Sequence, residues 1–329
     1  MIKRIKNICR RWWGQFWYFS PMIAIGDFLC TTILRNSNGK LKYKIIQSYY
    51  ERAKEIIAKK YKNIILKWEN VSLNNQKINL NDNIFIFWWQ GIDDAPPIIK
   101  KCICSIKKNA GKHKVILLDK SNYYQYANIP KYIIDKVNNG NINFTLFSYI
   151  LRCCLLYENG GIWIDPTCYM TKQFDEEMYK NSFYTIKHGD DWEFPICKGY
   201  WATFFLASTK KNPLMGFMRN LFFEFWKNEK YFIVYLSIDL FLSIAYDEFD
   251  WARNMIQNIP YNNKHRDDLR NMLLKNGGKN FEELCHQVNA DTYINKLTYK
   301  MFIEDVTYEE NALYKKKKKR FKRIYGSRS

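Results

Sequence analysis

The sequence predicts an α/β protein whose central sheet is covered by helices on both faces. Short, almost entirely apolar runs alternate with longer segments of helical length, and strands that are apolar on both sides are typical of a sheet buried on both faces. Hydrophobic residues make up 47% of the 329 residues, which is enough to bury a large core. We expect a helical arm before this sheet and a helical region after it.

The elements follow in order along the chain. The arm is predicted as a helix over 41–68, where apolar residues recur at three- and four-residue steps. Buried strands are predicted at 84–89 (IFIFWW), 114–118 (KVILL) and 162–164 (IWI). Helices between them run from the pair Pro96–Pro97 through 107 and over 143–157. Further helices are predicted at 213–227, 236–247, 251–257, 267–275 and 281–288.

These elements divide the chain into five parts. We predict a basic and aromatic segment at 1–36, a helical arm at 37–80 and a ligand-binding core at 81–210. A helical region at 211–310 completes the site, and 311–329 is a basic tail.

The net charge of +20 favours polyanionic partners, which include anionic lipid, nucleic acid and phosphorylated substrates. Composition alone does not choose among these three. The sequence has no helix-turn-helix, zinc-finger or RNP-type pattern, so we expect no nucleic-acid partner. Nine scattered cysteines without a C-x-x-C pair indicate reduced thiols in a reducing compartment.

The first 36 residues combine basic and aromatic side chains. Lysines and arginines precede a cluster that contains Trp12, Trp13 and Trp17, and Asp27 interrupts the apolar run that follows. An aspartate near the centre of a spanning helix costs at least about 2.5 kcal/mol. We therefore expect this segment to lie on an anionic membrane surface, at the cytoplasmic face of the inner membrane. The alternative is a helix that packs on the main domain.

The most informative stretch is 147–171, FSYILRCCLLYENGGIWIDPTCYMT. A helix carrying Arg152 is followed by two glycines and by a short strand that ends at Asp165. Ligands of such sheets bind outside the carboxyl ends of the strands, where Asp119 also lies. A carboxylate there suits Mg²⁺ or Mn²⁺, which prefer oxygen ligands, and Thr167 can supply a second oxygen. The alternative is that Asp165 only caps a turn.

At these residues the sequence resembles the capsular polysaccharide synthesis proteins, which are similar to the DXD-containing glycosyltransferases of family 32. The matching residues are Ser148, Arg152, Gly160, Gly161 and the triplet Asp165-Pro166-Thr167. Further matches are FWWQG at 87–91, AP at 95–96, VILLD at 115–119, WATFFLAS at 201–208, IPYNN at 259–263 and KLTYK at 296–300. This ordered set spans 81–300.

The resemblance implies a GT-A-like nucleotide-sugar-binding core with a central mixed sheet. It also implies a nucleotide-sugar donor, most readily a UDP-sugar, a saccharide acceptor, a divalent cation (Mn²⁺ or Mg²⁺) and retention of anomeric configuration. The resemblance assigns catalytic roles to three residues. Asp165 would contact the donor sugar or ribose, and Arg152 would stabilise the donor's negative charge. Asp239 would act on the acceptor side, and the alternative is that it is an ordinary residue on a helix surface. Donor-binding roles fall on Trp89, Gln90, Gly91, Ser148, Tyr149, Gly160 and Gly161. Metal-binding roles fall on Asp165, Thr167 and Asn295.

Three residues depart from the family's pattern. Tyr149 stands where an aspartate is usual, Thr167 replaces the second aspartate of D-x-D, and Asn295 replaces a histidine. These changes leave a second hypothesis open, in which the chain binds a nucleotide sugar or a saccharide without turning it over.

Overall fold

A computed structural model describes residues 2–34, 39–73, 76–189 and 196–300. The predicted basic tail at 311–329 lies outside these residues.

The core is a five-stranded sheet in the order β2-β1-β3-β6-β5. Its strands are β1 (Ile84–Phe87), β2 (Val115–Leu118), β3 (Gly161–Ile164), β5 (Phe183–Thr185) and β6 (Phe205–Ser208). Strand β1 pairs in parallel with β2 and β3, whereas β6 is antiparallel to β3 and β5. The expected α/β class and mixed sheet are confirmed.

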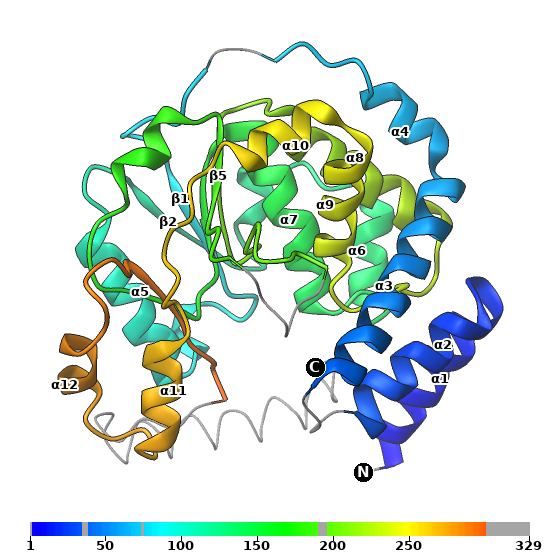
Figure 1. The fold of residues 1–329 in the computed structure, drawn as a ribbon, viewed down its shortest axis with the longest axis horizontal. Helices are drawn as coiled ribbons and strands as arrows, with labels where there is room; N and C mark the ends of the chain where they lie inside the picture. Colours follow the sequence, from blue (N-terminus) through cyan, green and yellow to red (C-terminus); the bar gives the residue numbers. More distant parts are fainter. Residues whose placement is uncertain (1, 35–38, 74–75, 190–195, 301–329) are drawn as a thin grey trace.

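Helices cover this sheet in layers (Figure 1). They are α5 (Pro97–Asn109), α6 (Lys131–Asn138), α7 (Phe144–Asn159), α8 (Pro213–Asn228), α9 (Ser237–Glu248) and α10 (Asp250–Gln257). Helix α7 lies against β3 and β6, and α8 and α9 pack on α7. The Asn143 side chain caps α7 by accepting from the backbone N–H of Leu146, and Gly160 ends it at φ +72°.

The N-terminal arm contains α1 (Ile2–Tyr18), α2 (Pro21–Phe28), a π-helical turn (Leu29–Ile33), α3 (Lys40–Lys60) and α4 (Lys62–Trp68). The single helix predicted over 41–68 is thus two helices that meet at Tyr61. Helix α3 packs on α9 and α4 packs on α8, so the arm is joined to the main domain. Among the described helices, none is long and apolar enough to cross a membrane.

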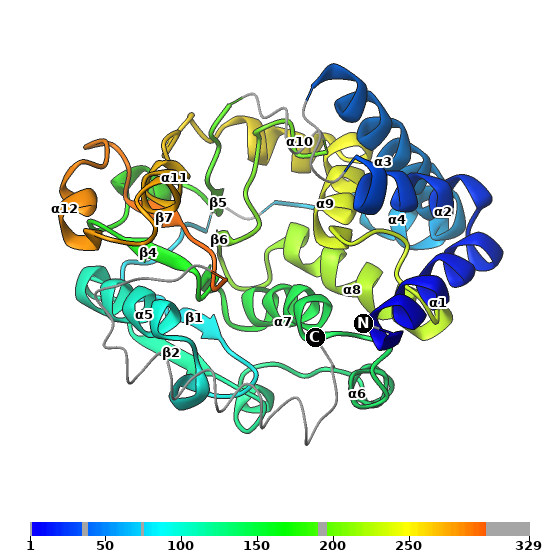
Figure 2. The ribbon, with the colours of Figure 1, turned by 90° about the horizontal axis from the view of Figure 1, so that it is seen from below.

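A second, two-stranded sheet lies at the other end of the molecule, with α11 (Asp268–Lys275) and α12 (Phe281–His286) (Figure 2). Its antiparallel strands are β4 (Cys168–Met170) and β7 (Ile294–Lys296), and Lys296 is in register with Cys168. This pairing carries the end of the described chain back to the segment that follows Asp165. Three short 3₁₀ helices connect other elements, at Ile92–Asp94, Tyr123–Gln125 and Glu176–Lys180.

Candidate active site

The carboxyl ends of the three parallel strands meet at one edge of the sheet. Gly91 follows β1, Asp119 directly follows β2, and Asp165 directly follows β3. A Cβ atom on Gly91 would lie 3.4 Å from the Asp119 carboxylate, so the first two strand ends are in close contact. Ligands of such sheets bind at this edge, as the sequence predicted for Asp119 and Asp165.

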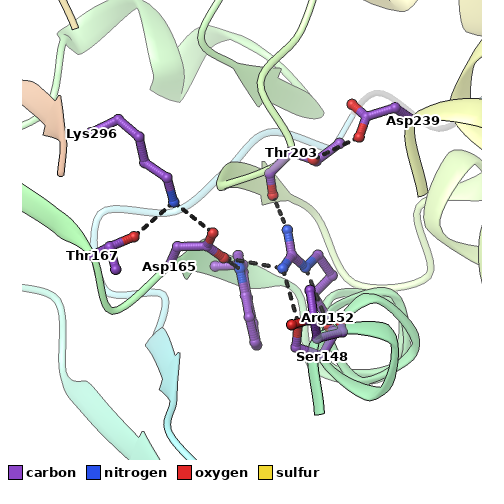
Figure 3. Close-up of polar contacts among 9 residues, drawn as sticks. Ser148, Arg152, Asp165, Thr167, Thr203, Asp239 and Lys296 are labelled. Atoms are coloured by element: carbon purple, nitrogen blue, oxygen red, sulfur yellow. Dashed lines mark hydrogen bonds and ion pairs between the residues drawn. The ribbon is translucent and has the colours of Figure 1, made fainter. Parts of the chain in front are cut away.

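The backbone around Asp165 is fixed by two hydrogen bonds. Its N–H donates to the Phe204 carbonyl (2.8 Å), and its carbonyl accepts from the N–H of Cys168 (3.0 Å). The second bond closes a tight turn through Pro166 and leads into β4. The turn places Thr167 on the same side as the Asp165 side chain (Figure 3).

The Asp165 carboxylate lies between two cations (Figure 3). Oδ1 accepts from Arg152 Nη2 (3.0 Å) and from Trp163 Nε1 (2.9 Å). Oδ2 accepts from Lys296 Nζ (2.7 Å), and this ammonium also donates to Thr167 Oγ1 (2.8 Å). Both carboxylate oxygens therefore already have cationic partners.

The charges of this cluster stabilise one another. Burial alone would raise the pKa of Asp165, but Lys296 and Arg152 hold it below its usual value. Burial alone would lower the pKa of Lys296, but the charge of Asp165 raises it above the usual value. At neutral pH the carboxylate and the ammonium are both ionised.

Arg152 is enclosed by protein, with a side chain that is 3% exposed. Its Nε donates to the Ser148 carbonyl (3.2 Å), Nη2 also reaches Ser148 Oγ (3.3 Å), and Nη1 donates to the Thr203 carbonyl. The guanidinium carbon lies 4.7 Å from the centre of the Trp163 ring. With these partners Arg152 is positioned to orient Asp165, and its expected effect on the donor's negative charge stays a prediction.

Tyr149 also contacts this arginine. Its ring centre lies 5.2 Å from the guanidinium carbon of Arg152, and its side chain is buried. The family pattern has an aspartate at this position. In this chain the ring of Tyr149 lies beside the Arg152 guanidinium and forms a cation–π contact with it. Among the expected donor-binding residues, Ser148 and Tyr149 thus contact Arg152, and their role toward the donor stays a prediction.

Asp239 is connected to the cluster through Thr203. It accepts from Trp201 Nε1 (3.1 Å) and from Thr203 Oγ1 (3.4 Å), and the Thr203 carbonyl accepts from Arg152. Burial raises the pKa of Asp239 to about 6. The carboxylate is buried on α9, so the alternative of a plain helix surface is excluded, whereas its acceptor-side role stays a prediction.

The other expected donor-binding residues separate into two groups. Trp89, Gln90 and Gly91 lie at the site edge directly after β1, but the Trp89 ring stacks between Phe144 (4.6 Å) and Tyr123 (6.5 Å). Gly160 and Gly161 lie at the other end of β3, one strand length from Asp165. A Cβ atom there would meet Lys210 N (2.6 Å) and Asn83 O (2.5 Å), respectively. Close packing therefore accounts for both glycines, and the donor-binding role expected for them stays a prediction.

A model of the capsular polysaccharide synthesis protein family matches residues 35–317 of this sequence, which include the whole sheet and every residue of the cluster. The chain belongs to the capsular polysaccharide synthesis protein family. Among solved structures it is similar to one described as PaToxG Glycosyltransferase, with 16% identity and a TM-score of 0.39, covering 77% of this chain and 99% of that chain. No curated protein matches the sequence.

The divalent cation implied by resemblance to this family does not fit the residues present. In proteins Mg²⁺ is held by one or two carboxylates together with substrate phosphates and waters. Here the oxygens of Asp165 and Thr167 accept from Lys296 and Arg152, and no group of three His, Cys, Asp or Glu side chains within the described ranges could hold a metal.

Asn295, the third expected metal ligand, does not join the cluster. It precedes Lys296 in β7, and neighbouring residues of a strand point to opposite faces. Its amide N–H donates to the Tyr169 carbonyl (3.4 Å), its side chain is fully buried, and its Oδ1 has no partner among the described residues. Asn295 thus lies apart from Asp165 and Thr167, and the metal-ligand role expected for it stays a prediction.

Lys296 is the site residue that the sequence alone did not predict. It lies 131 residues after Asp165 and reaches it only because β7 pairs with β4. The Lys296 N–H donates to the Arg266 carbonyl (2.7 Å), and the N–H of Leu297 donates to the Thr167 carbonyl (2.9 Å). The one available signal was the family-like stretch KLTYK at 296–300, which begins with this lysine.

Proposed function

We propose that this chain is a GT-A-type glycosyltransferase in capsular or other surface polysaccharide synthesis. It moves a sugar from a nucleotide-sugar donor to a saccharide acceptor, and we expect the donor to be a UDP-sugar. One observation carries the proposal: Asp165, with Lys296 and Thr167 beside it, stands at the carboxyl edge of a mixed α/β sheet. Membership in the capsular polysaccharide synthesis family supports it.

The cluster provides what this reaction requires. Transfer from a sugar diphosphate needs positive charge near the leaving group and an acceptor hydroxyl placed at the anomeric carbon. Asp165, oriented by Arg152, can accept hydrogen bonds from hydroxyl groups of the donor sugar or ribose. Lys296 can face the diphosphate. The half-buried position of Asp165 and Lys296 lets a ligand approach both while much of the water is excluded.

The test is turnover of UDP-, GDP-, CMP- and dTDP-sugars by the full chain, alone and with saccharide acceptors. The matched variants are Asp165→Asn and Asp250→Asn, because Asp250 is a carboxylate on α10 that is 87% exposed and pairs with Arg253. We expect turnover of one donor by the wild type and the Asp250 variant, and a loss of at least about 100-fold in Asp165→Asn.

Folding and binding readouts accompany this test. Asp165→Asn leaves buried Arg152 without its carboxylate, which costs stability, so thermal unfolding of each variant and its nucleotide binding are measured as well. Binding of one donor without turnover would favour the non-catalytic alternative. That alternative is based on Tyr149 and Thr167, which stand where the family pattern has aspartates. No binding of any donor would contradict the proposal. Anomeric retention stays a prediction, read from the NMR spectrum of the product.

We also propose that α1 and α2 lie on an anionic membrane surface. Eight of the 17 large hydrophobic side chains that are exposed in the described part of the chain lie between Trp13 and Ile33. Trp13, Phe16 and Trp17 are spaced three and four residues apart, so they share one face of α1. The opposite side of α1 is packed, because Gln15 is fully buried and donates to the Ile233 carbonyl (3.0 Å). Helix α2 is packed through the buried Ile23 and Ala24, and its Asp27 pairs with Arg11 of α1 (2.6 Å). Exposed aromatic residues beside basic residues are typical of interfacial helices.

A further inference from the structure

The Lys296 ammonium lies at the place where the sequence predicted a divalent cation. Its Nζ is 2.7 Å from Asp165 Oδ2 and 2.8 Å from Thr167 Oγ1, the two oxygens assigned to the metal. An ammonium carries three N–H donors. Two of them donate to these oxygens, and the third has no hydrogen-bond partner among residues 2–34, 39–73, 76–189 and 196–300.

Lys296 is also the cation of this cluster that a ligand can reach. Its side chain is 22% exposed, whereas that of Arg152 is 3% exposed and bonded to Ser148, Thr203 and Asp165. The Lys296 ammonium lies 4.8 Å from the centre of the Phe204 ring, and its backbone is held by the β4–β7 pairing. Its charge is therefore fixed in position before any ligand binds, which is the arrangement that electrostatic stabilisation of a leaving group needs.

We propose that Lys296 contributes the positive charge that a divalent cation would contribute, and that sugar transfer by this protein needs no metal ion. The inference rests on the proposed glycosyltransferase function. The bond between the anomeric carbon and the diphosphate breaks, and the nucleoside diphosphate keeps the electron pair. The acceptor hydroxyl oxygen forms the new glycosidic bond, and its proton leaves with the diphosphate. Lys296 Nζ donates to the diphosphate oxygens and stabilises the charge that develops there.

The chain offers a closely matched control in Lys101. Its ammonium is 2.6 Å from a carboxylate oxygen of Glu282 and 4.5 Å from the centre of the Phe281 ring, and its side chain is 24% exposed. Lys101 is on α5 and takes no part in the Asp165 cluster. Lys296→Met and Lys101→Met thus remove equivalent cations, one inside the site and one outside it, while Lys296→Arg keeps the charge in the site.

The first experiment measures the affinity for UDP, GDP and dTDP by calorimetry, in EDTA and then with Mn²⁺. We expect one nucleoside diphosphate to bind wild type equally in both conditions. In Lys296→Met its affinity should fall at least tenfold, with partial recovery in Lys296→Arg and no change in Lys101→Met. The EPR signal of free Mn²⁺ should not decrease when wild-type protein is added.

Turnover separates this inference from the proposed function. Donor turnover that persists in EDTA and falls in Lys296→Met supports both. Turnover with Mn²⁺ that EDTA abolishes overturns the role of Lys296 but leaves the glycosyltransferase function in place. Unchanged nucleotide affinity in Lys296→Met also overturns the inference. If no nucleoside diphosphate binds in either condition, the inference fails, and the proposed function fails with it only if no donor of the panel, CMP-sugars included, binds or is turned over.

Discussion

At the scale of single residues, the half-buried Asp165 and the buried Asp239 are two carboxylates with opposite environments. Asp165 lies between Arg152 and Lys296, which lower its pKa against the effect of burial. Asp239 has neutral hydrogen-bond partners, Trp201 and Thr203, and burial raises its pKa to about 6. One carboxylate therefore stays ionised over the physiological range, whereas the other titrates close to it.

The first prediction concerns the pH dependence of stability at Asp239. Its pKa is raised from 3.8 to about 6 on folding, so its contribution to stability is present below about pH 4 and is lost as the pH rises through about 6. Asp239→Asn has no such loss. The free energy of unfolding of the variant relative to wild type should therefore increase between pH 4 and pH 7, by at most about 3 kcal/mol. Denaturant unfolding at both pH values measures it.

The control for this prediction is Asp250→Asn, because Asp250 is 87% exposed. Its difference from wild type should stay within about 0.5 kcal/mol at both pH values, as is usual for surface substitutions. A relative stability of Asp239→Asn that falls as the pH rises would contradict the assignment.

At the scale of elements, the connection between α7 and β3 explains why glycines occupy positions 160 and 161. Gly160 has φ +72° and Gly161 has φ +102°, a region that favours glycine. Asn83 O, which a Cβ on Gly161 would approach to 2.5 Å, accepts from the N–H of Ile162 (2.9 Å). The pair is thus required to bring β3 beside β1, and it thereby sets where Asp165 emerges at the sheet edge.

The second prediction compares two glycines that both have positive φ. Gly161→Ala should lower the free energy of unfolding by about 2–4 kcal/mol, because strain is combined with a collision against backbone. Gly140→Ala should cost about 1 kcal/mol, because Gly140 has φ +74° but no atom within 4 Å of its Cβ position. Equal stability of the two variants, with nucleotide binding lost only in Gly161→Ala, would support the donor-binding role of Gly161.

The third prediction tests the exposed face of α1. Trp13→Ser with Trp17→Ser should reduce co-sedimentation with anionic vesicles about tenfold or more, since each tryptophan supplies a large interfacial contact. Tyr124→Ser with Tyr261→Ser is the matched control, because these aromatic residues are similarly exposed but lie outside the arm. Salt should weaken vesicle binding of the wild type. Equal sedimentation of both double variants would contradict membrane contact through α1.

At the scale of the whole molecule, one apolar core joins the arm, the sheet and the C-terminal helices. This core also determines how exposed the cysteines are. Five are buried, two are half-buried, and Cys9 and Cys104 are exposed. Burial raises the pKa of Cys153 and Cys168 to about 12, which suppresses their thiolate forms. The burial of five cysteines agrees with the buried thiols expected from the sequence, and their reduced state in the cell stays a prediction.

The fourth prediction is the thiol reactivity of the native protein. Cys9 and Cys104 should react rapidly with a chromogenic disulfide reagent, the half-buried Cys30 and Cys285 more slowly, and the five buried cysteines only after denaturation. Mass spectrometry of the labelled peptides gives the assignment. Rapid labelling of Cys153 or Cys168 in the folded protein would show that the core opens around α7 and β4.

The sequence by itself determined the elements whose signals are local. The three parallel strands, α5, α7 and the helices after residue 210 were predicted because hydrophobic periodicity, prolines and glycines act within a few residues. Asp165 and Thr167 were identified for the same reason, since a strand followed by a turn puts its last carboxylate at the sheet edge.

Only the tertiary structure decided what surrounds Asp165. The antiparallel strands β5 and β6 and the β4–β7 pair depend on partners distant in sequence, for which a local pattern carries no signal. The choice between Asn295 and Lys296 depended on strand register, because a shift of one residue along β7 exchanges the face turned toward Asp165. An expected metal ligand and an ammonium are neighbours in the sequence, and the pairing of β7 with β4 placed the ammonium in the site.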